Sequence, residues 1–67
     1  MDNRVKELRT AAGSSQATLG SAIGVSRQTV IAIERGRYDP SLRLALRIAR
    51  HFGLTVEEVF HDHADHA

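Results

Sequence analysis

One short segment of the chain carries side chains whose types could recognise the edges of DNA bases. Val30 and Ile33 mark the inward side of a helix in this segment, and four residues share its outer side: Arg27, Gln28, Ile31 and Ala32. Arginine can pair with guanine through two hydrogen bonds, glutamine can do the same with adenine, and isoleucine or alanine can touch the methyl group of thymine. The segment therefore indicates a base-reading helix. Arg27 and Gln28 are its strongest candidates, whereas Ile31 could instead be an exposed residue of no consequence.

The charge of the chain is divided unevenly along its length. Residues 1–52 carry all nine lysines and arginines with four acids, a balance of +5, whereas residues 53–67 carry four acids and no cation, a balance of −4. Eight of the nine cations are arginines, whose planar guanidinium group suits phosphate and guanine. The net charge of +1 thus hides a basic body, which favours an anionic partner.

Length and composition exclude several classes of protein. A chain of 67 residues is too small to hold a deep substrate cavity beside a full core, so we expect no enzyme and no cofactor. Because the chain has no cysteine, it has no disulfide and no thiolate metal site, which fits a reducing compartment. No apolar run approaches the roughly 20 residues that span a bilayer, and no signal peptide is found. We therefore expect no membrane contact and a cytoplasmic location.

Apolar periodicity and capping residues predict five short helices and no strand. The first expected helix covers about residues 3–12 and is capped by Asp2 or Asn3; the second lies between a Ser15 cap and Gly24. The third covers about residues 27–35 after a Ser26 cap, and the fourth lies between Ser41 and Gly53. The fifth has one to two turns and starts at a capping box of Thr55 and Glu58. Their apolar faces are expected to hold Val5, Leu8 and Ala12; Leu19, Ala22 and Ile23; Val30 and Ile33; Leu42, Ala45, Ile48, Ala49 and Phe52; and Val56, Val59 and Phe60. The sequence therefore predicts one all-α domain, whose short helices are stabilised by packing together.

Several motifs are spread over almost the whole chain. They are Asn3-Arg4-Val5-Lys6-Glu7-Leu8-Arg9, Gly13, Ser15-Gln16, Leu19, Gly24-Val25-Ser26-Arg27-Gln28-Thr29-Val30, Ile33-Glu34-Arg35-Gly36-Arg37-Tyr38 and Pro40-Ser41-Leu42. In residue type and spacing they resemble the Cro/C1-type (Xre) helix-turn-helix regulators, in their compact stand-alone form. The resemblance covers residues 3–60 and implies a five-helix bundle of the λ-repressor-like DNA-binding type, with the helix-turn-helix at the second and third helices.

Residues beside the reading helix are candidates for phosphate contacts, which fix register without reading sequence. Gln16 starts the second helix, where its side chain and free backbone amides can meet a phosphate, and the resemblance implies the same role. Other residues that flank the reading helix could clamp the DNA backbone: Thr29, Arg35, Arg37, Tyr38 and, less strongly, Arg43. Tyr38 could equally cover its own loop. Arg47 and Arg50 are expected on a solvated face of the fourth helix.

The resemblance also bears on the interior of the motif. It implies that Arg9 and Glu34 pair with each other beneath the helices instead of contacting DNA. Two positions depart from the family's usual pattern, because Ser14 stands where a leucine is usual and Gly20 where an alanine is usual. The first change removes a core side chain, and the second costs about 1 kcal/mol of helix propensity. We therefore expect a less stable second helix, in a domain that relies on dimerisation.

The end of the chain is expected to lie outside the folded domain. We assign residues 1–60 to the DNA-binding domain and residues 61–67 to an acidic tail. The tail holds residue types that bind metals, namely His61, Asp62, His63, Asp65 and His66. Nothing in the sequence would fix their geometry, so we expect a solvated tail and no metal site.

A homodimer suits a domain of this size. Two-fold symmetry would place two reading helices in successive major grooves, on a roughly palindromic operator. The expected dimer interface consists of Leu54, Val56, Val59 and Phe60, which could almost equally pack in the core of one chain. The sequence thus predicts a transcriptional regulator that binds double-stranded DNA as a homodimer, with repression as the expected outcome. The resemblance implies that it does so at the prokaryotic nucleoid. The alternative is an antitoxin-like module that binds a partner protein and regulates its own promoter.

Overall fold

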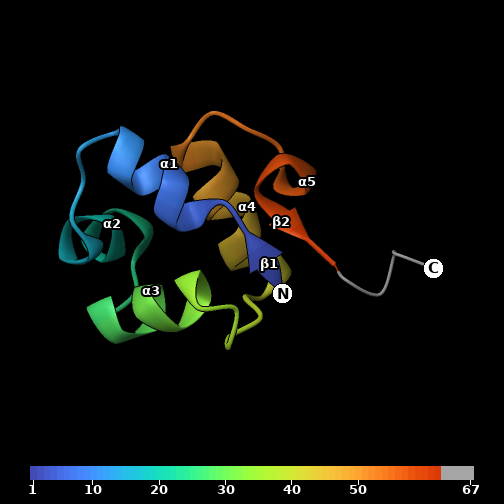
Figure 1. The fold of residues 1–67 in the computed structure, drawn as a ribbon, viewed down its shortest axis with the longest axis horizontal. Helices are drawn as coiled ribbons and strands as arrows, with labels where there is room; N and C mark the ends of the chain where they lie inside the picture. The colour runs from blue at the N-terminus through green and yellow to red at the C-terminus, as the bar shows by residue number, and fades with distance from the viewer. Residues whose placement is uncertain (63–67) are drawn as a thin grey trace.

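Serine and threonine caps set where four of the five helices begin. The computed structural model describes residues 1–62, which form five helices and two short strands (Figure 1). A capping hydroxyl accepts a hydrogen bond from a backbone N–H in the first turn of α2 (Gln16–Ile23), α3 (Arg27–Glu34), α4 (Leu42–His51) and α5 (Val56–Val59). These four starts confirm the predicted caps, including the capping box of α5. Within residues 1–62, none of the helices has the length and apolar character needed to cross a membrane.

The first helix, α1 (Val5–Ala11), is anchored by the residue two positions before it. Arg4 at its N-cap makes no side-chain capping bond, but Asn3 Oδ1 accepts a hydrogen bond from the Val5 N–H at 3.0 Å. The amide group of Asn3 also donates to the carbonyl oxygen of Ile33 at 2.7 Å. Asn3 therefore satisfies the start of α1 and connects it to the last turn of α3.

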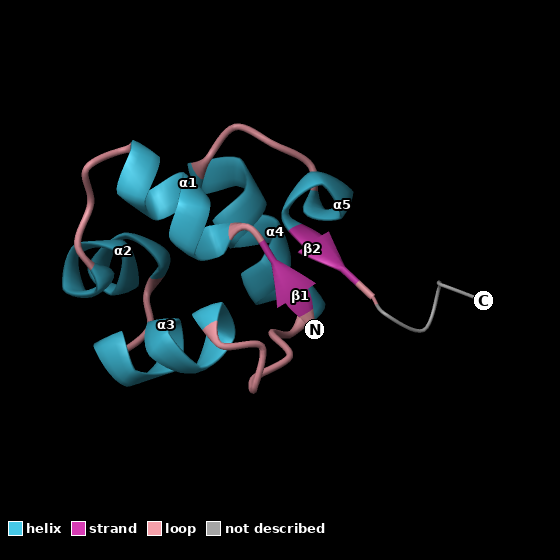
Figure 2. Cartoon of the chain, in the orientation of Figure 1, coloured by secondary structure: helices cyan, strands magenta, loops and turns pink. Residues whose placement is uncertain are grey.

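Two strands at the ends of the folded unit correct the expectation that the chain has none. β1 (Asp2–Asn3) pairs antiparallel with β2 (Phe60–His61), so that Asp2 lies opposite His61 and Asn3 opposite Phe60 (Figure 2). Strands of two residues are too short for the alternation that reveals a strand in a sequence. The pairing takes Phe60 out of the fifth helix and brings His61 into the folded unit. The domain boundary predicted after residue 60 therefore falls inside a strand.

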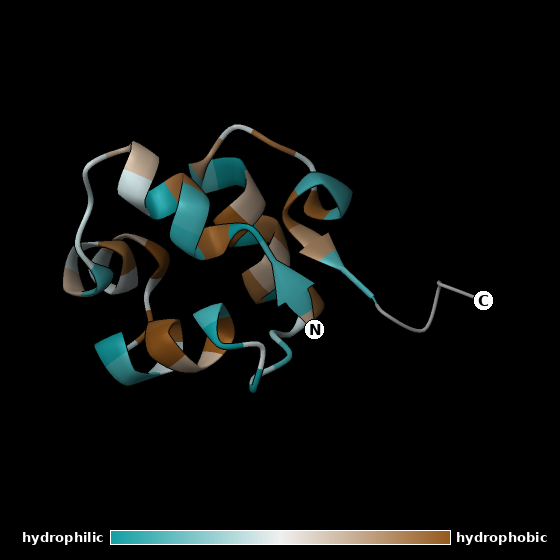
Figure 3. Ribbon diagram, viewed as in Figure 1, coloured by the Kyte–Doolittle hydropathy of each residue, from teal (hydrophilic) through white to brown (hydrophobic). Residues whose placement is uncertain are grey.

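The core forms where the five helices meet, and Figure 3 shows hydrophobic residues interspersed with hydrophilic ones along the helices. Its buried apolar members are Val5, Leu19, Ile23, Val30, Ile33, Leu44, Ala45, Ile48, Ala49, Val59 and Phe60. Three residues predicted on apolar faces are exposed instead: Ala12, Ala22 and Leu42. Ala12 and Leu42 lie at helix ends, and Ala22 lies one position before the buried Ile23. A periodic pattern identifies a face but not the point at which tertiary contacts along it stop.

The turn between α2 and α3 depends on two glycines. Gly24 ends α2 in the left-handed region, with a φ of 79°. Gly20 lies against the turn, since its carbonyl oxygen accepts a hydrogen bond from the Val25 N–H at 2.9 Å. A Cβ atom at position 20 would lie 2.7 Å from the carbonyl oxygen of Val25, well inside contact distance. Glycine at position 20 costs α2 some helix propensity, but it allows the turn to approach α2 more closely than a residue with a Cβ atom would.

Candidate nucleic-acid interface

One side of α3 is packed into the core while the other remains open. Val30 and Ile33 are each 1% exposed and anchor the helix. In the first turn Arg27 and Gln28 are exposed, and one turn later Ile31 and Ala32 are half-buried. The four residues proposed to read bases therefore all reach the surface, the two polar ones more than the two apolar ones.

A buried ion pair holds the end of α3 against α1. Arg9 Nε donates to Glu34 Oε2 at 2.6 Å, and Arg9 Nη2 donates to Glu34 Oε1 at 3.3 Å. The two side chains are only 10% and 4% exposed. Arg9 Nη1 also donates to the carbonyl oxygen of Ser14 at 2.9 Å, so the guanidinium group also fixes the segment before α2. The pairing of Arg9 with Glu34 implied by the family resemblance is thus present.

The same carboxylate orients Gln16. Gln16 Nε2 donates to Glu34 Oε1 at 3.1 Å, which links the start of α2 to the end of α3. Burial disfavours the charged form of Glu34, but hydrogen bonds from Arg9 and Gln16 and the charges of Arg9 and Lys6 outweigh it. The pKa of Glu34 therefore lies below its usual value, and the group is ionised at neutral pH. Because an amide nitrogen carries two hydrogens, Gln16 keeps one donor for an acceptor outside the chain.

A cleft of about 290 Å³ lies over this network and collects residues from three helices. This cleft, the α3 cleft, is lined by Lys6, Gln16, Arg27, Ile31, Glu34 and Arg35. It brings together Gln16, Arg27 and Arg35, which the sequence suggested for DNA contacts one by one. Three cations surround a single carboxylate there, so the cleft has a surplus of positive charge suited to a phosphate or a base edge.

Lys6 is a member of the α3 cleft that the sequence reasoning missed. It lies on α1, for which the sequence predicts no contact with DNA. A signal was available, because Lys6 precedes Arg9 by three residues and residues at that spacing share one side of a helix. Once Arg9 is placed beneath the motif, Lys6 is expected beside it at the surface.

The remaining phosphate candidates lie outside the α3 cleft. Thr29 is half-buried, and its hydroxyl oxygen is 3.1 Å from the hydroxyl oxygen of Ser26 at the start of α3. Arg37 and Tyr38 follow the end of α3 and are exposed, Tyr38 by 43%. Arg43 lines a different depression, on α4. The structure therefore separates these four residues from Gln16 and its neighbours.

Arg47 is exposed, as expected, but its guanidinium group also makes a contact that the sequence did not predict. Its Nη1 donates to the carbonyl oxygen of Ile23, the last residue of α2, at 3.0 Å. The guanidinium group thus caps α2 immediately before the turn that leads into α3. The two residues are 24 positions apart, so no local pattern in the sequence could reveal the contact. Arg50 is exposed and, within residues 1–62, makes no such bond.

Two of the four residues expected on a dimer surface belong to the core of one chain. Val59 is 0% exposed and Phe60 is 8% exposed, because α5 packs on α4 and β2 pairs with β1. Their side chains are therefore not available to a second chain. Leu54 and Val56 pack against the core but are half-buried, so each still presents part of its side chain at the surface.

The histidine-containing tail offers no metal site in the part of the chain that the structure describes. No group of three histidines, aspartates or glutamates within residues 1–62 is arranged to hold a metal ion. His63, Asp65 and His66, the other residues considered for such a site, lie outside the described residues.

Comparison with known proteins agrees with this architecture. A family model described as helix-turn-helix matches residues 5–59. YgzD of Bacillus subtilis, an uncharacterized HTH-type transcriptional regulator, is 57% identical over 60 residues, which are 90% of this chain and 91% of that protein. An uncharacterized HTH-type transcriptional regulator of Methanocaldococcus jannaschii is 50% identical, with the same shares of both chains covered.

A solved structure extends the similarity to three dimensions. The restriction-modification controller protein C.AhdI from Aeromonas hydrophila superposes with a TM-score of 0.76 at 40% sequence identity, over 85% of this chain and 86% of that one. The family is a class of DNA-binding proteins without enzymatic activity. With the turn between α2 and α3, the anchored third helix and the matches above, this chain belongs to the Cro/C1-type helix-turn-helix family of DNA-binding transcriptional regulators.

Proposed function

We propose that this chain is a sequence-specific repressor that reads its operator through α3. The observation that carries the proposal is the α3 cleft, in which Arg27 of the reading helix adjoins Gln16 and Lys6 from two other helices. Arg27 and Gln28 contact base edges by hydrogen bonds, and Ile31 and Ala32 touch thymine methyl groups. A helix anchored by two buried apolar residues can present such contacts at a fixed angle.

Phosphate contacts at the border of α3 set the register of this reading. Gln16, Lys6 and Arg35 meet the backbone at the cleft, whereas Arg37 and Tyr38 meet it beyond the end of α3. Glu34 does not touch DNA in this account. It acts as a positioning residue, because it accepts a hydrogen bond from Gln16 and leaves the second amide hydrogen of Gln16 available to a phosphate.

The operator is bound by two copies of the chain. One short helix contacts only a few base pairs, and a two-fold pair doubles the sequence that is read and spaces the reading helices about 34 Å apart. Val56, the first residue of α5, and Leu54, two positions before it, keep partly exposed apolar surface that a second copy can bury. A homodimer occupying a promoter in this way blocks transcription.

Selection from random duplex DNA at a fixed salt concentration tests two points together: whether the chain recognises a specific sequence, and whether that sequence has two symmetric half-sites. We expect enrichment of a roughly palindromic site whose half-sites lie about one helical turn apart. Salt must be held constant because phosphate contacts make the affinity depend on it. Enrichment of a single asymmetric half-site, with a strict monomer in sedimentation, would contradict the homodimer.

Arg27→Ala tests which surface reads the DNA, with Arg50→Ala as the matched control. Both variants remove one arginine charge, but Arg50 lies outside the α3 cleft. We expect Arg27→Ala to weaken binding to the selected site by about 1 to 3 kcal/mol, roughly 5- to 150-fold, and to relax the preference at one base pair. Arg50→Ala should change the affinity by less than about twofold. Equal losses would mean that α3 does not supply the specificity.

A further inference from the structure

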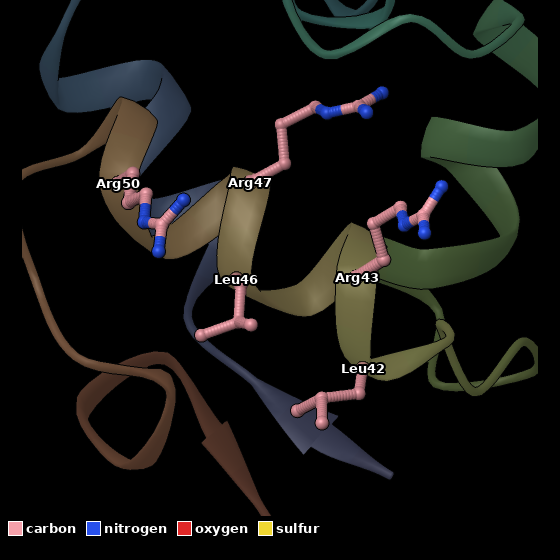
Figure 4. Close-up of a pocket in the computed structure, with 5 residues that line it drawn as sticks. All are labelled: Leu42, Arg43, Leu46, Arg47 and Arg50. Carbon is pink, nitrogen blue, oxygen red and sulfur yellow. The ribbon is translucent and has the colours of Figure 1, made fainter.

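A groove along α4 combines exposed leucines with arginines. It has a volume of about 390 Å³ and is lined by Leu42, Arg43, Leu46, Arg47 and Arg50, which define the α4 groove (Figure 4). Leu42 is 72% exposed and Leu46 is 37% exposed. Figure 4 shows the two leucines next to each other on one side of α4, pointing the same way. Apolar surface of this kind beside several charges is typical of a site for another macromolecule.

The arginines of the α4 groove lack an acidic partner in the described part of the chain. None of the salt bridges within residues 1–62 includes Arg43, Arg47 or Arg50. Arg47 uses one nitrogen on the carbonyl oxygen of Ile23, and its guanidinium group has further donors. Three positive charges therefore stand beside the leucines without a carboxylate to neutralise them.

We propose that the α4 groove docks an amphipathic helix of a partner protein, whose apolar stripe is flanked by aspartates and glutamates. Leu42 and Leu46 are four residues apart, and the three arginines recur every three or four residues. Both kinds of side chain therefore run as stripes along about 10 Å of α4. A helix laid along them would bury its apolar side chains on the leucines and place carboxylates against the guanidinium groups.

Charge and polarity favour this occupant over DNA and over a second copy of the chain. A phosphate backbone could neutralise the arginines, but it has no apolar surface to bury Leu42, which is mostly exposed. A two-fold contact centred on the groove would place each arginine stripe opposite its own copy, and like charges in an interface are costly. An acidic amphipathic helix satisfies the arginines and the leucines together.

The docking site is separate from the proposed reading of DNA. The α4 groove and the α3 cleft share no residue, and we expect one chain to bind both partners at once. The α4 groove would thus serve the protein-interaction role that the sequence left as an alternative. That role adds to the DNA-binding role and does not replace it.

The test measures binding of a synthetic peptide to the full chain at physiological salt. The peptide has about 18 residues, enough to form a helix, with a leucine stripe flanked by glutamates; a scrambled peptide of the same composition serves as its control. We expect calorimetric binding of the first peptide only, with the largest backbone amide NMR shifts in α4. Leu42→Ser and Arg50→Glu should each weaken it at least about tenfold. Lys6→Glu, the same charge reversal placed in the α3 cleft, should change it less than about twofold.

Four results would overturn the docking proposal: no binding, equal binding of the scrambled peptide, shifts centred on α3, or an affinity unchanged in Leu42→Ser. Sedimentation of the chain alone tests the other occupant, because a dimer that Leu42→Ser dissociates would mean that a second copy covers the groove. Operator binding by Leu42→Ser separates the two proposals. If the peptide fails but the operator is bound, only the docking proposal falls; if Arg27→Ala reads DNA normally, only the reading proposal falls.

Discussion

The α3 cleft and the α4 groove both collect positive charge, but they differ in what surrounds it. In the cleft a buried carboxylate, Glu34, accepts hydrogen bonds from Arg9 and Gln16 and fixes their positions. In the groove no carboxylate is present, and two leucines lie beside the arginines. The difference shows that two basic surfaces of one chain can suit different partners. A polar network with fixed geometry suits bases and phosphates, whereas exposed leucines favour a protein surface.

The largest expected effect removes the carboxylate on which the cleft depends. Glu34→Ala leaves the guanidinium group of Arg9 buried without its partner, so we expect the free energy of unfolding to fall by about 3 kcal/mol. The matched control is Glu7→Ala, which removes the exposed ion pair of Glu7 with Arg4 and should cost less than about 1 kcal/mol. Urea unfolding followed by circular dichroism measures both. Similar losses in the two variants would show that the buried pair of Glu34 with Arg9 stabilises the fold no more than an exposed ion pair does.

The pH dependence of stability tests whether the ionised carboxylate of Glu34 supports the cleft. Because the pKa of Glu34 is lower in the folded chain than in the unfolded chain, its contribution is fully present above the unfolded value of about 4.3. It is lost as the pH falls through the folded pKa. We therefore expect the stability difference between the natural chain and Glu34→Gln to shrink as the pH is lowered below about 4, in urea titrations at a series of pH values. A difference that stays constant would mean that Glu34 is not the ionised centre of the network.

A smaller effect is expected where the α4 groove supports the helix-turn-helix. Arg47→Ala removes the hydrogen bond to the carbonyl oxygen of Ile23, and water can partly replace it because the side chain is exposed. We expect a loss of about 1 kcal/mol in urea unfolding. Arg50→Ala, one helical turn further along, should change stability by less than about 0.5 kcal/mol. If the two variants behaved alike, Arg47 would not brace the turn.

The smallest effect is expected at the most exposed leucine of the groove. Leu42→Ser should change the free energy of unfolding by less than about 0.5 kcal/mol, because Leu42 is 72% exposed. Ile48→Ala, on the buried side of the same helix, should cost about 3 kcal/mol. Thermal and urea unfolding compare the two. If Leu42→Ser lowered the free energy of unfolding by more than about 1 kcal/mol, the leucine would pack within the domain and would not be available to a partner.

Local signals account for most of what the sequence could predict. Ser15, Ser26, Ser41 and Thr55 mark helix starts because a cap acts on the residues directly after it. The inward side of α3 follows from the spacing of its apolar residues in the same way.

Contacts between distant parts of the chain account for what the sequence did not reveal. The pairing of β1 with β2 and the bond from Arg47 to Ile23 join segments that no local pattern connects. The exposure of Leu42 likewise depends on which helices lie next to each other. Packing of this kind appears only when the helices are placed in three dimensions.

The central claim is that DNA is read at the α3 cleft and not at the α4 groove. Titration of the isotope-labelled chain with the selected operator duplex, followed by backbone amide NMR shifts, tests it most directly. The account predicts the largest shifts at Gln16, Arg27 and Gln28, with Leu46 and Arg50 nearly unchanged. Largest shifts along α4, with α3 unaffected, would contradict it.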